Sequence, residues 1–233
     1  MMRLYVLVEG QTEEEFVGMT LRPHLAAHSI WVYPIIVETS RDAFGRKRRG
    51  GGRWHHWLRD FKHLTSQQSG NDVRFTTMFD LYGLPEDFPD LQEHYGDSDT
   101  VSRANKLEMA MAKAVGDRRL IPYLQRHEFE ALVLGGLDVL GGLLEDPGDV
   151  AGLATLQSSI AGTPPEDVND GRSSAPSKRL EGHIPGYRKR LHGPLVVGGV
   201  GLSTLRRVCP RFGAWVSKLE SLASPSAVSP STL

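Results

Sequence analysis

The chain has 233 residues, of which 39% are hydrophobic, and its 27 basic and 28 acidic residues give a formal net charge of -1. A folded core is therefore expected, while a uniformly basic nucleic-acid-binding protein is excluded, so any contact with nucleic acid must be local. The single cysteine, Cys209, excludes an intramolecular disulfide and a cysteine-rich zinc site. No signal-peptide core or membrane-spanning apolar run is found, which predicts a soluble cytoplasmic protein without a membrane partner.

The first predicted element is a buried strand over residues 4–8, which ends in Glu9 and Gly10. Gly10 permits a tight turn, and Thr12 is expected to cap a helix over residues 13–27 that Pro23 disturbs near its end. In an open parallel sheet, ligands bind beyond the carboxyl ends of the strands, so Glu9 lies where a functional residue is expected. The alternative is that Glu9 only forms an ion pair with a surface lysine.

Residues 31–37 form the second predicted strand, in which Pro34 indicates an edge position or a bulge. The next segment, residues 45–53, contains five positive charges and four glycines, which predicts a mobile solvated loop. Its basic residues are candidates for binding nucleic-acid phosphates, and the alternative is a simple linker. These candidates are Arg46, Lys47, Arg48, Arg49 and Arg53.

An amphipathic helix is expected over residues 53–65, with Trp54 and Trp57 in the core rather than stacked on bases. A further strand over residues 73–81 carries a second acid, Asp80, close to its end. Because strands alternating with helices favour a parallel α/β sheet, this acid and that of the first strand could meet at one sheet edge. Carboxylates from separate strands suit Mg²⁺, and such a site favours metal-assisted attack of water on a phosphodiester.

The rest of the chain is expected to be largely helical. The predicted segments are a turn at residues 82–85, a surface loop at 85–99, a helix at 102–115, a short strand at 120–124, two short helical pieces from Gly135, a flexible loop at 170–176, and helices at 201–208 and 210–222. The apolar stripe of the last helix, around Trp215 and Leu219, could serve a core or a homodimer. We expect an α/β core over residues 1–135, a helical part over 136–222 packed on it, and a disordered tail over 223–233.

Three ionisable residues, His127, Glu128 and Glu130, stand beside an apolar run. On a helix, His127 and Glu130 would share a face while Glu128 would point elsewhere. A carboxylate buried among apolar side chains is costly unless a cation or hydrogen bonds compensate, which makes Glu130 a candidate ligand. For His127 the alternative is a hydrogen-bonded structural residue, and as a ligand it would suit Mn²⁺ or Zn²⁺ better than Mg²⁺.

Several motifs resemble known families. Residues 8–14, Val-Glu-Gly-Gln-Thr-Glu-Glu, with Asp80 at a strand end, look like a Toprim domain of overcoming-lysogenization-defect nucleases. More closely, the chain resembles a bacterial Toprim-like family of unknown function, DUF4276, over nearly all of residues 3–222. The motifs that carry this resemblance are residues 80–85, 127–132, 176–179, 184–187, 201–203 and 209–212.

The resemblance implies a Toprim-like, Rossmann-like parallel sheet flanked by helices, with a mainly helical C-terminal extension. Toprim enzymes hold Mg²⁺ with a strand-end glutamate and an Asp-x-Asp pair, but here Tyr82 stands in place of the second aspartate. Glu130 resembles a further acid of the lysogenization-defect group, and Lys178 or Lys189 could contact the scissile phosphate. The candidate metal ligands are Glu9, Asp80, Glu130 and, as an option, His127; the candidate catalytic residues are Glu9, Glu13, Asp80, Glu128, Glu130 and Lys178; Arg179 and Lys189 join the nucleic-acid-binding candidates.

The function that the resemblance implies is a Mg²⁺- or Mn²⁺-dependent nuclease, with DNA favoured over RNA. It further implies an effector of a bacterial anti-phage defence module with an ABC-type or AAA-type ATPase as partner. The sequence has no P-loop, so ATP hydrolysis would belong to that partner. Two alternatives stay open: a catalytically degenerate module that binds nucleic acid or regulates an ATPase, and a purely structural partner subunit.

Overall fold

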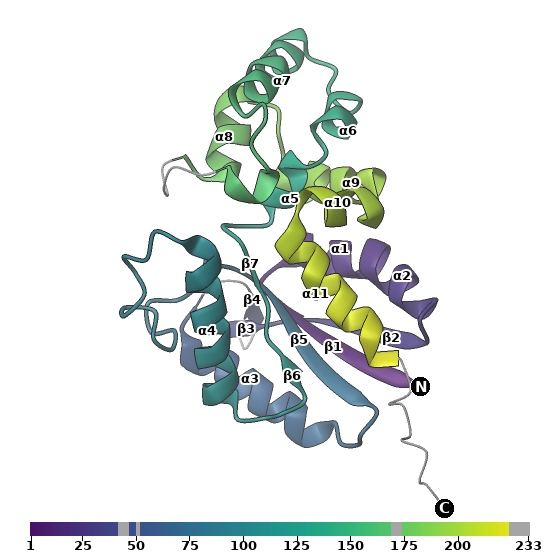
Figure 1. Cartoon of the computed structure of the whole chain (residues 1–233), viewed down its shortest axis with the longest axis vertical. Helices are drawn as coiled ribbons and strands as arrows, with labels where there is room; N and C mark the ends of the chain where they lie inside the picture. The colour runs from purple at the N-terminus through teal and green to yellow at the C-terminus, as the bar shows by residue number, and fades with distance from the viewer. Residues whose placement is uncertain (42–46, 50–51, 169–173, 224–233) are drawn as a thin grey trace, which may run out of the picture.

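The computed structural model describes residues 1–41, 47–49, 52–168 and 174–223. At its centre lies a five-stranded sheet in the order β2-β1-β5-β6, with β7 also paired to β5. All of these pairings are parallel. The strands are β2 (Ile30–Ile36), β1 (Met2–Val8), β5 (Val73–Asp80), β6 (Leu120–Ile121) and β7 (Leu124–Gln125). Helices flank the sheet (Figure 1), which confirms the predicted α/β class, and Pro34 lies on the edge strand as predicted.

The central strand β1 is buried on both faces because its side chains alternate between two cores. Leu4, Val6 and Val8 belong to one core, and Tyr5 and Leu7 belong to the other. A strand covered by helices on both faces reads as a continuous apolar run, which is why residues 4–8 were recognisable from the sequence.

Two helices, α3 (Trp54–Gln67) and α4 (Thr100–Val115), cover one face of the sheet. Trp57 is fully buried, and its ring centroid lies 4.4 Å from that of Phe79 on β5. Trp54 is also buried. The tryptophans of this helix are therefore core residues, as predicted.

The first helical segment differs from the single helix that was expected. It consists of α1 (Gln11–Phe16), a π-helical segment η1 (Val17–Leu21) and α2 (Arg22–Ala26). Gly10, in an extended conformation, is the N-cap residue, and Thr12 is buried inside the first turn, so the prediction that Thr12 caps the helix is wrong. The π-helical segment ends just before Pro23, which cannot donate a backbone hydrogen bond.

The basic segment also differs in part from the expected loop. Residues 47–49 form β4 (Lys47–Arg49), which pairs antiparallel with β3 (Glu38–Arg41). Glycine and arginine content predicted an irregular loop, but it did not reveal that Glu38–Arg41 offers these residues an antiparallel partner. Arg46 lies outside the described residues.

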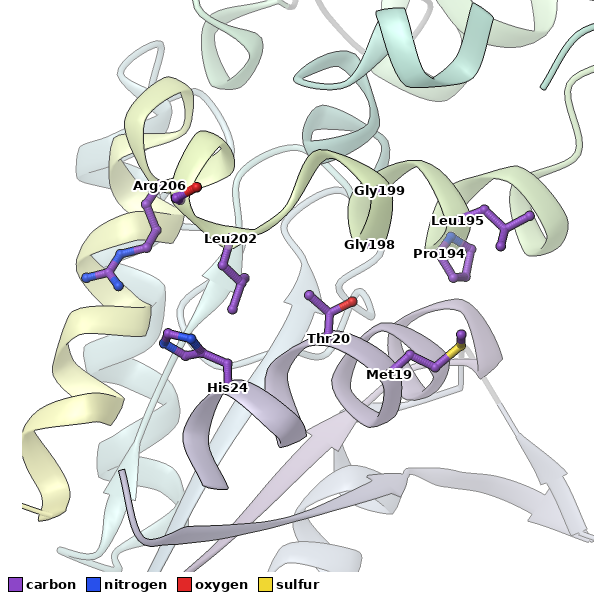
Figure 2. Close-up of a pocket in the computed structure, with 10 residues that line it drawn as sticks. Met19, Thr20, His24, Pro194, Leu195, Gly198, Gly199, Leu202 and Arg206 are labelled. Atoms are coloured by element: carbon purple, nitrogen blue, oxygen red, sulfur yellow. The ribbon is translucent and has the colours of Figure 1, made fainter. Parts of the chain in front are cut away.

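The C-terminal part is helical. Its elements are α5 (Glu130–Leu134), α6 (Leu137–Gly141), α7 (Pro147–Ser159), η2 (Pro165–Asp167), α8 (Pro176–His183), α9 (Lys189–Val200), α10 (Leu202–Val208), α11 (Pro210–Glu220) and η4 (Ser221–Ala223). Helices α5 to α9 gather beyond the carboxyl ends of the strands (Figure 1). A cavity of about 620 Å³ lies between η1 and α2 on one side and α9 and α10 on the other (Figure 2). The flexible loop predicted at 170–176 lies mostly, and the tail predicted at 223–233 almost wholly, outside the described residues.

Helix α11 packs its apolar stripe against the sheet. Trp215 stacks on Tyr123 with a centroid distance of 4.5 Å, and its indole Nε1 donates to Thr76 Oγ1 at 2.9 Å. Trp215 and Leu219 are both buried. This stripe therefore belongs to the core, and a homodimer would have to use a different surface.

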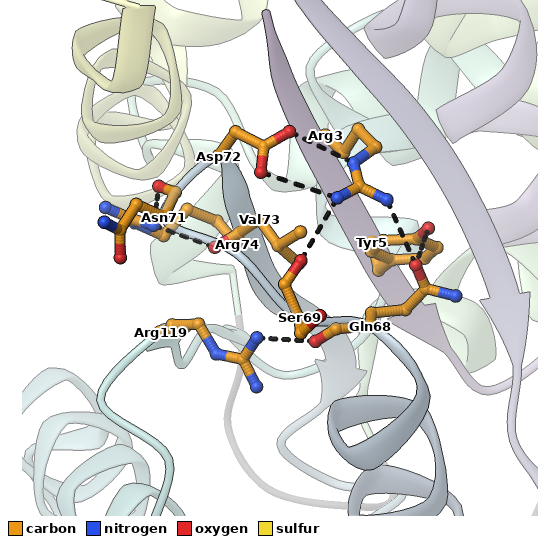
Figure 3. Close-up of polar contacts among 9 residues, drawn as sticks. All are labelled: Arg3, Tyr5, Gln68, Ser69, Asn71, Asp72, Val73, Arg74 and Arg119. Carbon is orange, nitrogen blue, oxygen red and sulfur yellow. Dashed lines mark hydrogen bonds and ion pairs between the residues drawn. The ribbon is translucent and has the colours of Figure 1, made fainter.

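A polar network joins α3 to the amino ends of the central strands (Figure 3). The guanidinium of Arg119 donates to the carbonyl oxygens of Gln68 at 2.6 Å and Thr65 at 3.0 Å, and it also pairs with Asp117. Because the last carbonyl groups of a helix have no partner within the helix, Arg119 satisfies the C-terminal end of α3.

We expect Arg119→Met to lower the free energy of unfolding by about 1–3 kcal/mol, because hydrogen bonds from a charged donor are lost. Urea denaturation measures this change. The neighbouring Arg118→Met is the matched control, since Arg118 is exposed and should tolerate the same substitution. An equal loss in both variants would contradict the assigned role of Arg119.

Candidate functional site

Two acids meet at the carboxyl edge of the sheet. Glu9 follows β1 and Asp80 ends β5, and these strands are neighbours paired up to Val8 and Met78. The backbone N–H of Asp80 donates to Glu9 Oε1 at 2.8 Å. The structure thus brings together the two strand-end acids that the sequence predicted to meet.

A glycine lets the chain turn tightly around this pair. A Cβ atom on Gly83 would lie 2.9 Å from Glu9 Oε2, so a larger residue here would force the Glu9 carboxylate to shift. The Gly83 N–H also donates to the Asp80 carbonyl oxygen at 3.0 Å, which closes the turn after β5. The turn predicted at 82–85 therefore presses the backbone against the two carboxylates.

Two further acids and one lysine complete the cluster. Glu13 on α1 is buried, and Glu130 at the start of α5 is fully buried. Lys189, the first residue of α9, places its Nζ 3.0 Å from Glu130 Oε2 and 3.9 Å from Asp80 Oδ2. Two of these four carboxylates thus lie within 4 Å of one ammonium group.

This arrangement raises the pKa values of several carboxyl groups. Burial raises the pKa of Glu9 to about 7, and the charge of Glu13 adds to the shift, while the N–H of Asp80 and the charge of Lys189 oppose it. Burial likewise raises the pKa of Asp80 well above its usual value, with Lys189 opposing and the neighbouring acids adding. Burial raises the pKa of Glu130 to about 7 as well. Each of these carboxyl groups therefore gives up its proton at a higher pH than an exposed carboxyl does.

For Lys189, burial and the neighbouring charges shift the pKa in opposite directions. Burial acts to lower its pKa, but the charges of Asp80, Glu130 and Glu13 outweigh burial and raise the pKa above its usual value. The lysine therefore stays protonated at neutral pH. It supplies a positive charge at a place where a phosphate could also reach it.

A cavity of about 450 Å³ opens on the cluster. Its charged lining consists of the acids Glu9, Glu13 and Asp80 and the basic residues Lys189 and Arg190. Arg190 was not singled out from the sequence, although its position in the basic run of residues 187–190 was a usable signal. A cavity lined by both acids and basic groups suits a ligand that carries both a cation and an anionic group.

The residues fit a hard divalent cation. Asp80 Oδ1 and Glu130 Oε1 are buried and have no hydrogen-bond partner. Mg²⁺ takes oxygen ligands and commonly uses only one or two protein carboxylates together with waters. Among the described residues, no three of these carboxylates bring their oxygens within 4.8 Å of one another, so two of them, Glu9 and Asp80, could hold one ion together.

Three other candidates lie apart from this cluster. Glu128 accepts a hydrogen bond from the Ser177 N–H at 2.6 Å and so binds the N-terminal end of α8. Lys178 pairs with Glu181 at 2.8 Å on the exposed side of the same helix, and Arg179 donates to the Ser174 carbonyl oxygen. The basic residue beside the carboxylates is Lys189 and not Lys178.

His127 does not share a helix face with Glu130, so that expectation is wrong. Its φ of 62° is left-handed, which places it before α5 rather than inside it. The imidazole is buried, and its Nε2 lies 3.0 Å from the Glu166 carbonyl oxygen, to which it donates. The structure thus gives His127 the hydrogen bond of a structural residue.

We expect His127 to make the protein sensitive to acid. Burial, helped by the charge of Arg126, lowers the pKa of His127 to about 4. An unfolded chain binds this proton near pH 6.5, so the contribution is present above that pH and lost as the pH falls toward 4. Between pH 7 and pH 5 the loss is about 2 kcal/mol.

Urea denaturation at both pH values tests this expectation with His127→Asn, because asparagine tolerates a left-handed backbone. The variant should lose less stability on acidification than the wild type. His63→Asn, which removes an exposed histidine of α3, is the control. If both variants lose as much stability as the wild type, another group carries the acid sensitivity.

The basic candidates of residues 46–53 are only partly placed. Lys47, Arg48 and Arg49 belong to β4, and Arg53 is the exposed N-cap residue of α3.

Comparison with known proteins gives one family and several distant structures. The family model described as "Domain of unknown function (DUF4276)" matches residues 8–220. No curated protein matches. The C-terminal region of the Burkholderia pseudomallei OLD protein is similar at 15% identity and a TM-score of 0.48, covering 95% of this chain and 98% of that one. The C-terminal region of the Xanthomonas campestris pv. campestris OLD protein is similar at 14% identity and a TM-score of 0.44, covering 95% of this chain and 94% of that one.

None of the helices in the described parts of the chain combines the length and the apolar character that crossing a membrane requires.

Proposed function

The chain belongs to the DUF4276 family, and from its strand-end carboxylates we propose that it is a metal-dependent nuclease that hydrolyses phosphodiester bonds of nucleic acid. The observation that carries this proposal is the meeting of Glu9 and Asp80 on adjacent strands, where Asp80 Oδ1 and Glu130 Oε1 are buried carboxylate oxygens without a hydrogen-bond partner. The motif at residues 8–14, which resembles a Toprim domain, supports the same reading.

In this proposal Glu9 and Asp80 hold the cation and Glu130 stands next to them. A bound Mg²⁺ or Mn²⁺ would neutralise charge on the scissile phosphate and lower the pKa of the attacking water. Lys189 and Arg190 line the same cavity and would face the phosphate oxygens. In this step the water oxygen would bond to phosphorus and the bond from phosphorus to the leaving sugar oxygen would break, while the proton that the water gives up would pass through solvent to that leaving oxygen.

Exposed basic residues would then bind the rest of the nucleic acid. Arg190 and Arg53 are exposed, and each phosphate that such a residue neutralises adds salt-dependent affinity. We further propose DNA as the favoured substrate and a role as effector in an anti-phage defence module. Since the sequence has no P-loop, an ATPase partner would supply nucleotide-dependent control.

A second candidate is a catalytically degenerate module that binds nucleic acid or regulates an ATPase. Tyr82 stands where the resemblance places a second aspartate, and its ring contacts that of His127 at 5.2 Å. The same place therefore supplies an aromatic ring instead of a metal ligand.

Calorimetric titration with Mg²⁺ and Mn²⁺ separates these functions when plasmid DNA and RNA cleavage are assayed in the same buffers. The nuclease proposal expects metal binding that Glu9→Gln removes, together with cleavage that EDTA stops. Nucleic-acid binding without cleavage under either ion would favour the degenerate module. Cleavage by Glu9→Gln at the wild-type rate would refute the assigned site.

A further inference from the structure

A second cluster of metal-ligating side chains lies far from the strand-end carboxylates. It consists of His24 on α2, His28 just beyond the end of that helix, and Glu220, the last residue of α11. One ligating atom of each residue lies within 4.8 Å of the other two. Within the described parts of the chain, it is the only group of three His, Cys, Asp or Glu residues whose ligating atoms lie this close together.

The distances show that the side chains already converge. His24 Nε2 lies 2.6 Å from Glu220 Oε1, and His28 Nε2 lies 3.8 Å from the same oxygen. The two imidazole centroids are 5.2 Å apart. His24 and Glu220 are partly buried and His28 is exposed, so an ion could enter from solvent.

Local backbone structure explains the convergence of the two histidines. They are four residues apart, a spacing that places side chains on one side of a helix. The turn continues past α2, because the N–H of Ala27 donates to the His24 carbonyl oxygen and the N–H of His28 to that of Leu25. Both imidazoles therefore face the end of α11.

Arg206 orients the carboxylate from the other side. Its Nη1 lies 2.6 Å from Glu220 Oε1, and its Nη2 lies 3.0 Å from Oε2. This bidentate pairing fixes the plane of the carboxylate. Outer partners of this kind commonly orient metal ligands in proteins.

We propose that His24, His28 and Glu220 form a binding site for a borderline transition-metal ion such as Zn²⁺. Two imidazole nitrogens and one carboxylate oxygen are ligands that suit Zn²⁺, whereas Mg²⁺ prefers oxygen ligands. This site is independent of the strand-end carboxylates, which offer oxygen only.

Three protein ligands leave the fourth tetrahedral position of Zn²⁺ open to water or another small ligand. His24 and Arg206 also line the cavity of about 620 Å³ between α2 and α10, where Figure 2 shows both side chains near Leu202. The open position is therefore reachable from a cavity. The ion would also fasten α2 to the end of α11, two segments separated by 196 residues between His24 and Glu220.

The test uses the full chain carrying Asp80→Asn, so that the strand-end site does not add to the signal. After treatment with EDTA, the protein is titrated with ZnCl₂ in the calorimeter and melted with and without Zn²⁺. We expect one equivalent of Zn²⁺ to bind and the melting temperature to rise, because an ion that binds only the folded state stabilises it. Co²⁺ should give the intense visible absorption of a tetrahedral site.

The variants His28→Gln and Glu220→Gln should weaken Zn²⁺ binding at least about 10-fold and abolish the thermal shift. His28→Gln is the safer variant for folding, because the His28 side chain is 41% exposed and does not contact Arg206 in the pairing above. His63→Gln, in the same background, removes an exposed histidine of α3 and should bind as the parent does.

Three results would overturn this site. They are the absence of Zn²⁺ binding by the parent, binding by His28→Gln at the parent's affinity, and equal weakening by His63→Gln, which would indicate adventitious binding to surface histidines. Because Asp80→Asn is present throughout, none of these results bears on the proposed nuclease site.

Discussion

Asp80→Asn should abolish metal-dependent cleavage without destabilising the metal-free protein. Removing a metal ligand should lower activity by more than the roughly 10- to 100-fold that follows when a residue hydrogen-bonded to a ligand is removed. Burial and the neighbouring acids raise the pKa of Asp80 well above its usual value, so its ionised form is unfavourable in the folded state. An uncharged isostere avoids the cost of burying an ionised carboxylate at this position.

The sign of the stability change is the informative part. A group with a raised pKa stabilises the fold below the pKa of the unfolded chain and loses this contribution as the pH rises through the folded value. The unfolding free energy of Asp80→Asn at pH 7.5 without metal should therefore equal or exceed that of the wild type. Residues that serve function at the expense of stability behave in this way.

Urea denaturation in EDTA and plasmid cleavage in Mg²⁺ measure the two effects on the same samples. Asp138→Asn, a carboxylate on α6 that contacts Gln157, is the control and should keep its activity. An active Asp80→Asn protein would remove Asp80 from the metal site. An inactive but strongly destabilised variant would mean that Asp80 is needed for folding instead.

Lys189→Met should lower the stability of the metal-free protein and increase the stabilisation that Mg²⁺ provides. The substitution removes the positive charge 3.0 Å from the fully buried Glu130. Breaking a buried pair costs about 3–5 kcal/mol, but the Lys189 side chain is 39% exposed and solvent screens it, so we expect about 1–3 kcal/mol. A divalent cation would replace the missing charge.

Thermal melting over a Mg²⁺ titration measures this coupling. The rise in melting temperature at saturating Mg²⁺ should be larger for Lys189→Met than for the wild type. Arg190→Met is the matched control, because Arg190 is exposed and lines the same cavity without contacting Glu130 in the pairs described. Identical Mg²⁺ shifts in all three proteins would show that Lys189 and the cation do not share these carboxylates.

The strand ends could be predicted from the sequence because they depend on residues that are adjacent in the chain. An apolar run such as residues 4–8 can only be a buried element, and an acid directly after it must lie at an edge of the sheet. The same reasoning located Asp80. Parallel order in the sheet then brought the two acids together, which the hydrogen bond from the Asp80 N–H to Glu9 reports.

The features that the sequence did not reveal depend on distant parts of the chain. Lys189 and Lys178 both lie in basic runs, and only the position of α9 against α5 places Lys189 beside Glu130. His127 looked helical, but its bond to the carbonyl oxygen of Glu166 belongs with a left-handed backbone. His24 and Glu220 carry no common motif, since their meeting depends on how α11 packs on α2.

The most direct test of the metal site is a crystal structure of the protein soaked in MnCl₂, with anomalous diffraction recorded at a wavelength where manganese scatters. We expect an anomalous peak bonded to Glu9 and Asp80 at the carboxyl edge of the sheet. The absence of a peak there, with Lys189 still occupying the space between Glu130 and Asp80, would contradict it.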